Sequence, residues 1–302
     1  MKLFIKILLS PLRLIFFLIS LPFKLLKLLF SPISNWINNS KFGKFFSDVP
    51  DDRPVMEAAS EVFKSPSIFF DQIEDFRKHL LRSLLFLVVS ILFSFTFTDQ
   101  IIAFIAQPVG GLASLQAIEV TESLGVFMKV ALLLGVAFAL PYITFEIWLF
   151  IAPGLMPRSR KVSLITIPFA LLFFVSGLAF AYYFLLPSTL PFLLDFMGVS
   201  TKLRPQSYFD FVTGIMFWIG VSFEFPLVIF GISSMGWINP SMLLKQWRMA
   251  VVVVSVIAAV ITPTVDPVNM SLVMAPMIGL YFISILFSWV ANMAIKTDSP
   301  VN

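Results

Sequence analysis

The sequence of 302 residues contains no cysteine and a single histidine, His79. The missing cysteines exclude disulfides, cysteine-ligated metals and thiol catalysis, and one histidine leaves little for a histidine-based metal or acid–base site. Because His79 stands near Arg77 and Arg82, we expect it to be a solvated residue on a polar helix face. No nucleophile–base arrangement, phosphate-binding glycine loop or metal-ligand spacing occurs. The sequence therefore predicts a protein that is not an enzyme and that binds no cofactor, metal or nucleic acid.

Charged residues are also scarce. Only 13% of the residues are charged, about half the usual share of roughly 25% in soluble proteins. In contrast, 59% of the residues are hydrophobic and the mean hydropathy is +0.95. About 20 apolar residues in a helix cross the ~30 Å hydrocarbon core of a bilayer. The sequence thus predicts an all-α integral membrane protein.

Six apolar segments are long enough, or nearly so, to be transmembrane helices. Their approximate bounds are 80–98, 124–151, 162–186, 209–232, 249–261 and 270–295. The fourth is interrupted by Glu224 and Pro226, and the fifth is short, with about 20 Å of helix. A span this short requires the bilayer to become thinner or the polar flanking side chains to snorkel. The alternative is that these spans are longer and that their boundaries lie a few residues away from those given.

The positions of the cations predict the orientation. All but three of the 21 lysines and arginines fall on one side if both termini are cytoplasmic, and cytoplasmic segments favour cations. The three exceptions are Lys129, Lys202 and Arg204. The external segments would instead carry five acids, namely Asp99, Glu119, Glu122, Asp195 and Asp266. We therefore expect six helices with both termini in the cytoplasm.

Residues 1–33 form a basic and apolar extension. Placed about 100° apart, as in a helix, their five cations fall within a sector of about 60°, while Pro11 and Pro22 lie opposite. This pattern favours a helix in short pieces that lies in the membrane interface with its cations toward anionic headgroups. A further span or hairpin and a targeting sequence remain alternatives. Residues 34–66 are a polar linker, 67–295 the six-span domain and 296–302 a cytoplasmic tail.

Ionisable residues within the spans need a reason, because a charge in hydrocarbon is costly. Glu224 is either a neutral carboxyl that bonds a neighbouring helix, a residue facing a water-filled groove, or a polar contact for a partner helix. Lys129, near the outer end of the second span, either snorkels or contacts a partner. Glu146 lies near the inner end of the same span, and Asp266 lies in an external turn, TPTVDP, where structure and function are both open.

A series of motifs follows in a fixed order. The first are DFRKHLL, AQPVG and TESLGVFMKV, and then comes PYITFEIWLFIAPGLMPRSRK. The last are GLAFAYYFLLP, GVSFEFP, ITPTVDPVNM and APMIGLY. In this order and spacing the chain from about Phe70 to Asn292 resembles the TatC family, the six-span subunit of twin-arginine protein translocases. DFRKHLL is similar to the family's N-terminal box HL-ELR-RL, and PYITFEIWLFIAPGL to the end of its second span.

The resemblance implies a receptor in the bacterial cytoplasmic (inner) membrane. Members of the family recognise signal peptides with paired arginines on folded cargo. With small single-span partners of the TatA and TatB types they form a multi-copy assembly, driven by the proton-motive force. The resemblance also implies a cupped bundle of six helices. A secondary transporter or proton-coupled channel that uses Glu224 as a proton carrier is the alternative function, although no inverted repeat is evident.

The resemblance also implies the site residues. Asp75, with Glu74 beside it, matches the first acid of the family's box, and Arg77 matches its arginine. Ser159 stands where the family has a second acid, so we hypothesise that Glu146 or Glu74 supplies the missing charge. Phe282 likewise replaces a usual glutamate. The other implied residues are Phe150, Pro153 and Leu155 for the signal peptide, Glu224, Lys129 and Tyr182 for partners, and Pro108 and Asp266 in external loops.

Overall fold

A computed structural model describes residues 66–155, 160, 162–194, 203–262 and 267–296, and all regular elements in these ranges are helices. Five continuous helical stretches are long and apolar enough to cross a membrane: Gln72–Val109, Glu122–Ile151, Thr166–Pro191, Pro205–Ser234 and Pro267–Met293. The sixth apolar segment forms a shorter helix, α13 (Trp247–Ile261), of 15 residues. The described residues do not include the expected extension, the linker except for Pro66, the turn around Asp266, or the tail except for its first residue.

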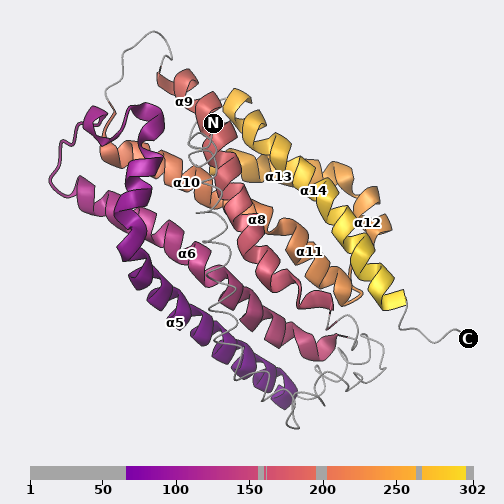
Figure 1. Ribbon diagram of the computed structural model, residues 1–302. Helices are drawn as coiled ribbons and strands as arrows, with labels where there is room; N and C mark the ends of the chain where they lie inside the picture. Colours follow the sequence, from indigo (N-terminus) through magenta and orange to yellow (C-terminus); the bar gives the residue numbers. More distant parts are fainter. Residues whose placement is uncertain (1–65, 156–159, 161, 195–202, 263–266, 297–302) are drawn as a thin grey trace, which may run out of the picture. The chain divides into compact units, whose positions relative to one another are not determined.

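The first long helix, α5 (Pro66–Ile105), has 40 residues and thus a length of about 60 Å. This is twice the hydrocarbon thickness of about 30 Å, so its charged first turns can extend beyond the apolar layer. α5 packs mainly on α6 (Glu122–Ile151), which runs antiparallel to it (Figure 1). The two helices come close because Gly135 has no side chain: a Cβ there would lie 2.8 Å from the Cα atom of Ile91.

The third stretch consists of α8 (Thr166–Phe180), a π-helical turn η4 (Ala181–Leu185) and α9 (Leu186–Leu194). The fourth consists of α10 (Pro205–Phe223) and α11 (Phe225–Ser234). The break between α10 and α11 falls at Glu224, as expected from the interruption of the apolar pattern by that residue and Pro226. α8 and α10 cross where two glycines meet, since a Cβ on Gly177 would lie 2.8 Å from the Cα atom of Gly220.

The C-terminal helices form a second group of contacts. α12 (Pro240–Lys245) and α13 precede the long α14 (Pro267–Lys296), which packs on α11 and α13. The Ser233 hydroxyl donates to the Ser288 hydroxyl at 2.8 Å between α11 and α14. A hydrogen bond between small polar side chains lets two helices approach closely in an apolar environment.

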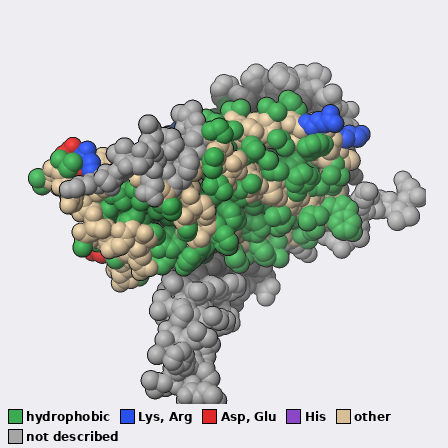
Figure 2. Space-filling model, turned by 90° about the horizontal axis from the view of Figure 1, so that it is seen from above, with side chains coloured by type: hydrophobic (Ala, Val, Ile, Leu, Met, Phe, Trp, Pro, Cys, Tyr) green, Lys and Arg blue, Asp and Glu red, His purple; other side chains and the backbone are tan. Residues whose placement is uncertain are grey.

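Hydrophobic side chains cover most of the face shown in Figure 2, and its few charged side chains lie toward the two ends. This distribution suits a bundle surrounded by lipid, because charges are tolerated at the polar boundaries of a bilayer and not between them. The described part of the chain is thus an all-helical integral membrane protein by length and composition of its helices.

Candidate functional site

The charged first turns of α5 hold the predicted carboxylates. The side chains of Glu74, Asp75 and Arg77 are exposed. The ammonium group of Lys78 lies 3.2 Å from an oxygen of each carboxylate, Glu74 Oε1 and Asp75 Oδ1. Such pairs on a solvated helix surface are weak and exchange readily. The two carboxylates are therefore accessible to another cation.

Glu146 lies beside this turn, on α6. It is 3% exposed, and both of its oxygens accept hydrogen bonds. The Tyr142 hydroxyl donates to Oε1 at 2.7 Å, and Nδ1 of His79 lies 2.5 Å from Oε2. The expectation that His79 is simply a solvated residue was wrong, because His79 faces α6, where a carboxylate one helix away gives the ring a partner.

Aromatic contacts complete this surface. The rings of Phe76 and Phe150 meet edge to face with centroids 5.5 Å apart, and Phe150 is exposed. We call Glu74, Asp75, Phe76, His79, Glu146 and Phe150 together the α5–α6 face. The structure thus brings together the N-terminal box and the end of the second span, which are about 70 residues apart in the sequence.

The turn that follows α6 is held by an arginine. Arg160, itself buried, donates from Nη2 to the carbonyl oxygens of Leu155 at 3.2 Å and Pro153 at 3.5 Å. Leu155 is buried and Pro153 is exposed. The structure therefore assigns these two predicted residues different surroundings, and Ser159 lies outside the described residues.

Glu224 occupies the junction between α10 and α11. Its backbone carbonyl accepts from the N–H groups of Leu227 and Val228, which starts α11. Among the described residues its side-chain Oε1 is buried and has no hydrogen-bond partner. A buried polar atom without a partner is costly, and the described helices leave this oxygen unpaired.

Lys129 does not simply snorkel. Its ammonium group forms an ion pair with Asp210, which lies on α10, and both side chains are partly exposed. Sequence reasoning missed Asp210, although an acid in the fourth apolar segment and a base in the second were a recognisable pair. Tyr182, in η4, donates to the carbonyl oxygen of Phe104 at 2.9 Å. Lys129 and Tyr182 are therefore held by separate internal contacts.

Tyr182 has a counterpart in α10. The Tyr208 hydroxyl donates to the carbonyl oxygen of Ile105 at 2.7 Å. The last carbonyls of a helix have no intrahelical partner, so these two tyrosines satisfy the C-terminal end of α5. Pro108 follows in the exposed 3₁₀ turn η1 (Gln107–Val109), and Asp266 lies outside the described residues.

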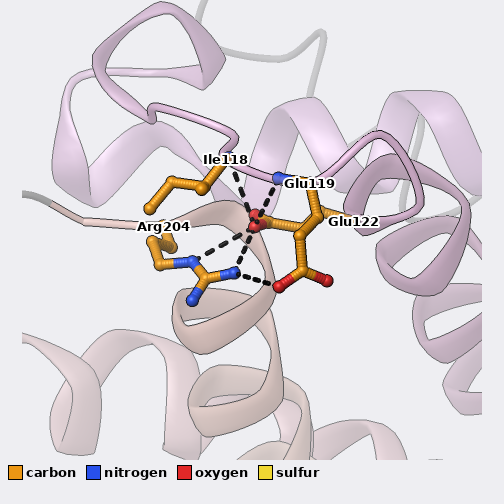
Figure 3. Close-up of polar contacts among 4 residues, drawn as sticks. All are labelled: Ile118, Glu119, Glu122 and Arg204. Carbon is orange, nitrogen blue, oxygen red and sulfur yellow. Dashed lines mark hydrogen bonds and ion pairs between the residues drawn. The ribbon is translucent and has the colours of Figure 1, made fainter.

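A second charged cluster lies at the start of α6 and α10 (Figure 3). Oε1 of Glu122 accepts from Arg204 Nε at 3.1 Å and Nη2 at 2.6 Å, and also from the backbone N–H groups of Ile118 and Glu119. Arg204 Nη2 also donates to Glu119 Oε1 at 3.1 Å. These bonds, first to Glu122 and then to Glu119, raise the pKa of Arg204 above its ordinary value.

We call Arg204, Glu119 and Glu122 the Arg204 cluster. Sequence reasoning placed all three in external segments but did not pair them. The signal was available, because Arg204 is one of only three cations that depart from the charge asymmetry. Glu122 is buried, at 1% exposure, so the cluster fixes the loop before α6 to the start of α10. In the described residues no group of three or more His, Asp or Glu side chains is placed to hold a metal ion.

Comparisons with known proteins identify the family of the chain. The sequence model of the family described as Sec-independent protein translocase protein (TatC) matches residues 71–276. The TatC protein of Deinococcus radiodurans is 34% identical over 248 residues, covering 79% of this chain and 91% of that protein. TatCy of Bacillus subtilis is 33% identical over 240 residues, covering 77% and 92%.

Solved structures are similar as well. A crystal structure of the twin-arginine translocase receptor TatC is similar with a TM-score of 0.62 and 28% identity, covering 73% of this chain and 99% of that one. A structure of the same receptor in the detergent DDM gives a TM-score of 0.64 and 26% identity, covering 71% and 98%. The chain with the α5–α6 face and the Arg204 cluster belongs to the TatC family of Sec-independent protein translocase proteins.

Proposed function

We propose that this chain is the receptor and core subunit of a twin-arginine protein translocase. It binds signal peptides with paired arginines and assembles with TatA/TatB-type single-span proteins to export folded cargo, driven by the proton-motive force. The family membership supports this function. The observation that carries it is the α5–α6 face, where exposed carboxylates adjoin an exposed aromatic ring.

Paired arginines match the chemistry of this face. A guanidinium presents several donors in a planar fork and forms two parallel hydrogen bonds with a carboxylate. Asp75 and Glu74 carry only weak bonds from Lys78, so they can accept a first arginine. Arg77, Phe150, Pro153, Leu155 and Ser159 complete the proposed peptide site, and Glu146 or Glu74 serves the second arginine.

Glu224 is the proposed contact for a partner helix. Its buried, unpaired oxygen can take part in a hydrogen bond at membrane depth, and a protonated carboxyl can also donate one. Burial in hydrocarbon disfavours the charged form. Glu224→Gln should therefore keep most export and most association with a partner, and Glu224→Ala should lose both. Equal export by the native chain and these two variants would contradict the proposed role of Glu224. Lys129 and Tyr182 contribute to the partner-binding region through the positions of α6 and η4.

The proposed topology has six membrane-spanning helices in a cupped bundle, with α13 as the short fifth span. Both termini lie in the cytoplasm, Pro108 and Asp266 lie in external loops, and the membrane is the bacterial cytoplasmic membrane. The concentration of cations in the segments assigned to the cytoplasm supports this orientation. Residues 1–33 lie in the membrane interface. Labelling of single cysteines introduced in these segments, in intact cells, tests each assignment, because the natural chain has none.

The test of the receptor function is site-specific crosslinking of a twin-arginine peptide to the full chain. Asp75→Asn should reduce crosslinking about tenfold or more, because a bidentate pair with a charged group is lost. A peptide with two lysines in place of the arginines is the matched control and should crosslink weakly to all forms. Unchanged crosslinking in both Glu74→Gln and Glu146→Gln would exclude these two residues as the source of the second charge.

A further inference from the structure

The contact between His79 and Glu146 is unlike the other polar contacts of the α5–α6 face. It joins two helices, and it involves a carboxylate that is almost completely buried beside the peptide site proposed above. The Glu146 side chain is 4% exposed and the His79 side chain 22% exposed. The imidazole is therefore the more exposed member of the pair. Its ring also lies edge to face with Phe150, with centroids 6.2 Å apart.

The two donors to Glu146 differ in how they can be removed. Tyr142 is one turn earlier on the same helix, so it moves together with the carboxylate. His79 belongs to α5, and a rotation of its side chain alone would release Oε2. An ionised carboxylate only accepts hydrogen bonds, so Nδ1 of His79 is the donor when Glu146 is ionised. A protonated ring would add a positive charge to this bond and strengthen it.

We propose that His79 is a placeholder for a signal-peptide arginine on Glu146. In the unliganded chain the imidazole occupies Oε2, and an incoming guanidinium displaces it and takes over the carboxylate. The proposal rests on the receptor function stated above. It makes His79 a positioning residue that sets the affinity for paired arginines, and it explains how a carboxylate so deeply covered can still serve as the second acid.

The charged groups around His79 determine whether a positive charge on its ring raises or lowers the affinity for the peptide. On α6 it contacts Glu146, whose other oxygen accepts from Tyr142. On its own helix, Asp75 lies one turn before it and Arg82 one turn after it, and the ammonium of Lys78 points to Glu74 and Asp75. Beyond α6, Arg160 is engaged with backbone carbonyls. A protonated ring at position 79 would add a cation that repels and competes with the peptide.

The experiment measures the affinity of the full chain in lipid nanodiscs for a fluorescent peptide. The peptide has two consecutive arginines, a blocked amino terminus and no histidine, so it does not titrate between pH 6 and 8. Imidazole changes charge in this range. The native chain should bind about five- to tenfold more tightly at pH 8 than at pH 6, as expected for a competing charge-assisted bond.

Two variants isolate His79. His79→Gln retains a neutral donor for Glu146, so its affinity should be the same at both pH values and close to that of the native chain at pH 8. His79→Ala uncovers the carboxylate and should bind more tightly than the native chain at pH 6. The gain should disappear in the double variant His79→Ala/Glu146→Gln, because the carboxylate that receives the arginine is then missing.

Lys78→Gln is the matched control. It removes one positive charge from the adjacent position but leaves Glu146 untouched, so the native pH dependence should persist. The same ratio of affinities at pH 8 and pH 6 in the native chain and in His79→Gln would overturn the placeholder role. Equal affinity of the native chain for peptides with two arginines and with two lysines, at both pH values, would contradict the proposed receptor function and therefore also this inference.

Discussion

Glu146 and Glu122 lie near opposite ends of the same helix, α6, and both are almost completely buried. Glu122 is held by a guanidinium and two backbone N–H groups, all directed at one oxygen. Glu146 is held by a hydroxyl of its own helix and by an imidazole from α5. One carboxylate thus has a permanently charged guanidinium as its partner, and the other has a hydroxyl and an imidazole.

The difference is also one of pH sensitivity. The pKa of Arg204 is raised by its carboxylate partners. A raised pKa of a base contributes stability that is lost only when the pH rises through the folded-state value, which for arginine lies far above the physiological range. The charge of Arg204, and the stability that it contributes, therefore stay constant in the pH range in which histidines in general can gain or lose a proton. One end of α6 is held to a loop by the Arg204 cluster, and the other end is where we propose that partners exchange.

The largest effect is expected where α6 and α5 are in closest contact, between these two ends. Gly135→Val should destabilise the protein by about 3 kcal/mol, because a Cβ at this position would lie 2.8 Å from a backbone atom of Ile91. Gly125→Ala, in the same helix, is the control, since a Cβ there has no neighbour within 4 Å. Thermal unfolding in detergent measures both. Equal stability of the two variants would show that the helices separate without cost.

A smaller loss is expected at the Arg204 cluster. Arg204→Gln removes the charge that compensates buried Glu122. The resulting decrease in the unfolding temperature should be several times as large as the decrease caused by Arg77→Gln, which alters an exposed arginine. The double variant Arg204→Gln/Glu122→Gln should recover part of the loss, because no uncompensated charge remains. If the single and double variants were equally unstable, burial of a lone charge would not be the cause. The comparison between the two ends of α6 would then lose its physical basis.

The smallest effect is expected at the ion pair of Lys129 and Asp210. Asp210→Asn should cost at most about 1 kcal/mol, because both side chains are partly exposed and such pairs contribute little. Exchanging the two residues, as Lys129→Asp with Asp210→Lys, should restore the native stability. A loss well above that of Arg204→Gln would reverse the order and make this pair the main link between α6 and α10.

Much of the bundle follows from the apolar pattern. The helices expected at 80–98 and 124–151 occur within α5 and α6, and the break at Glu224 and the short α13 also occur as expected. Periodicity and length suffice to predict these features because a helix in lipid forms all of its backbone hydrogen bonds within itself. Helix ends were less accurate, since α5 extends well beyond the apolar segment in both directions.

The contacts between helices were harder to predict. The roles of His79, Asp210 and Arg204 depend on which residue of another helix lies opposite, and their partners are 67, 81 and 82 positions away. Sequence spacing places residues on a face of one helix but does not specify the partner helix or its register. The close helix contacts at Gly135, Gly177 and Gly220 could not be predicted either, because a glycine can occur within a span for many different reasons.

The sequence by itself determined that the chain is an all-helical membrane protein of the TatC family, because composition, apolar segment length and ordered motifs are local properties of the chain. Only the tertiary structure decided which charges meet. The side chains of α5, α6 and α10 have to lie opposite one another before Glu146 is covered by His79 and Glu122 is bound by Arg204. Gly135 permits the close approach of α5 and α6, the two helices that carry His79 and Glu146.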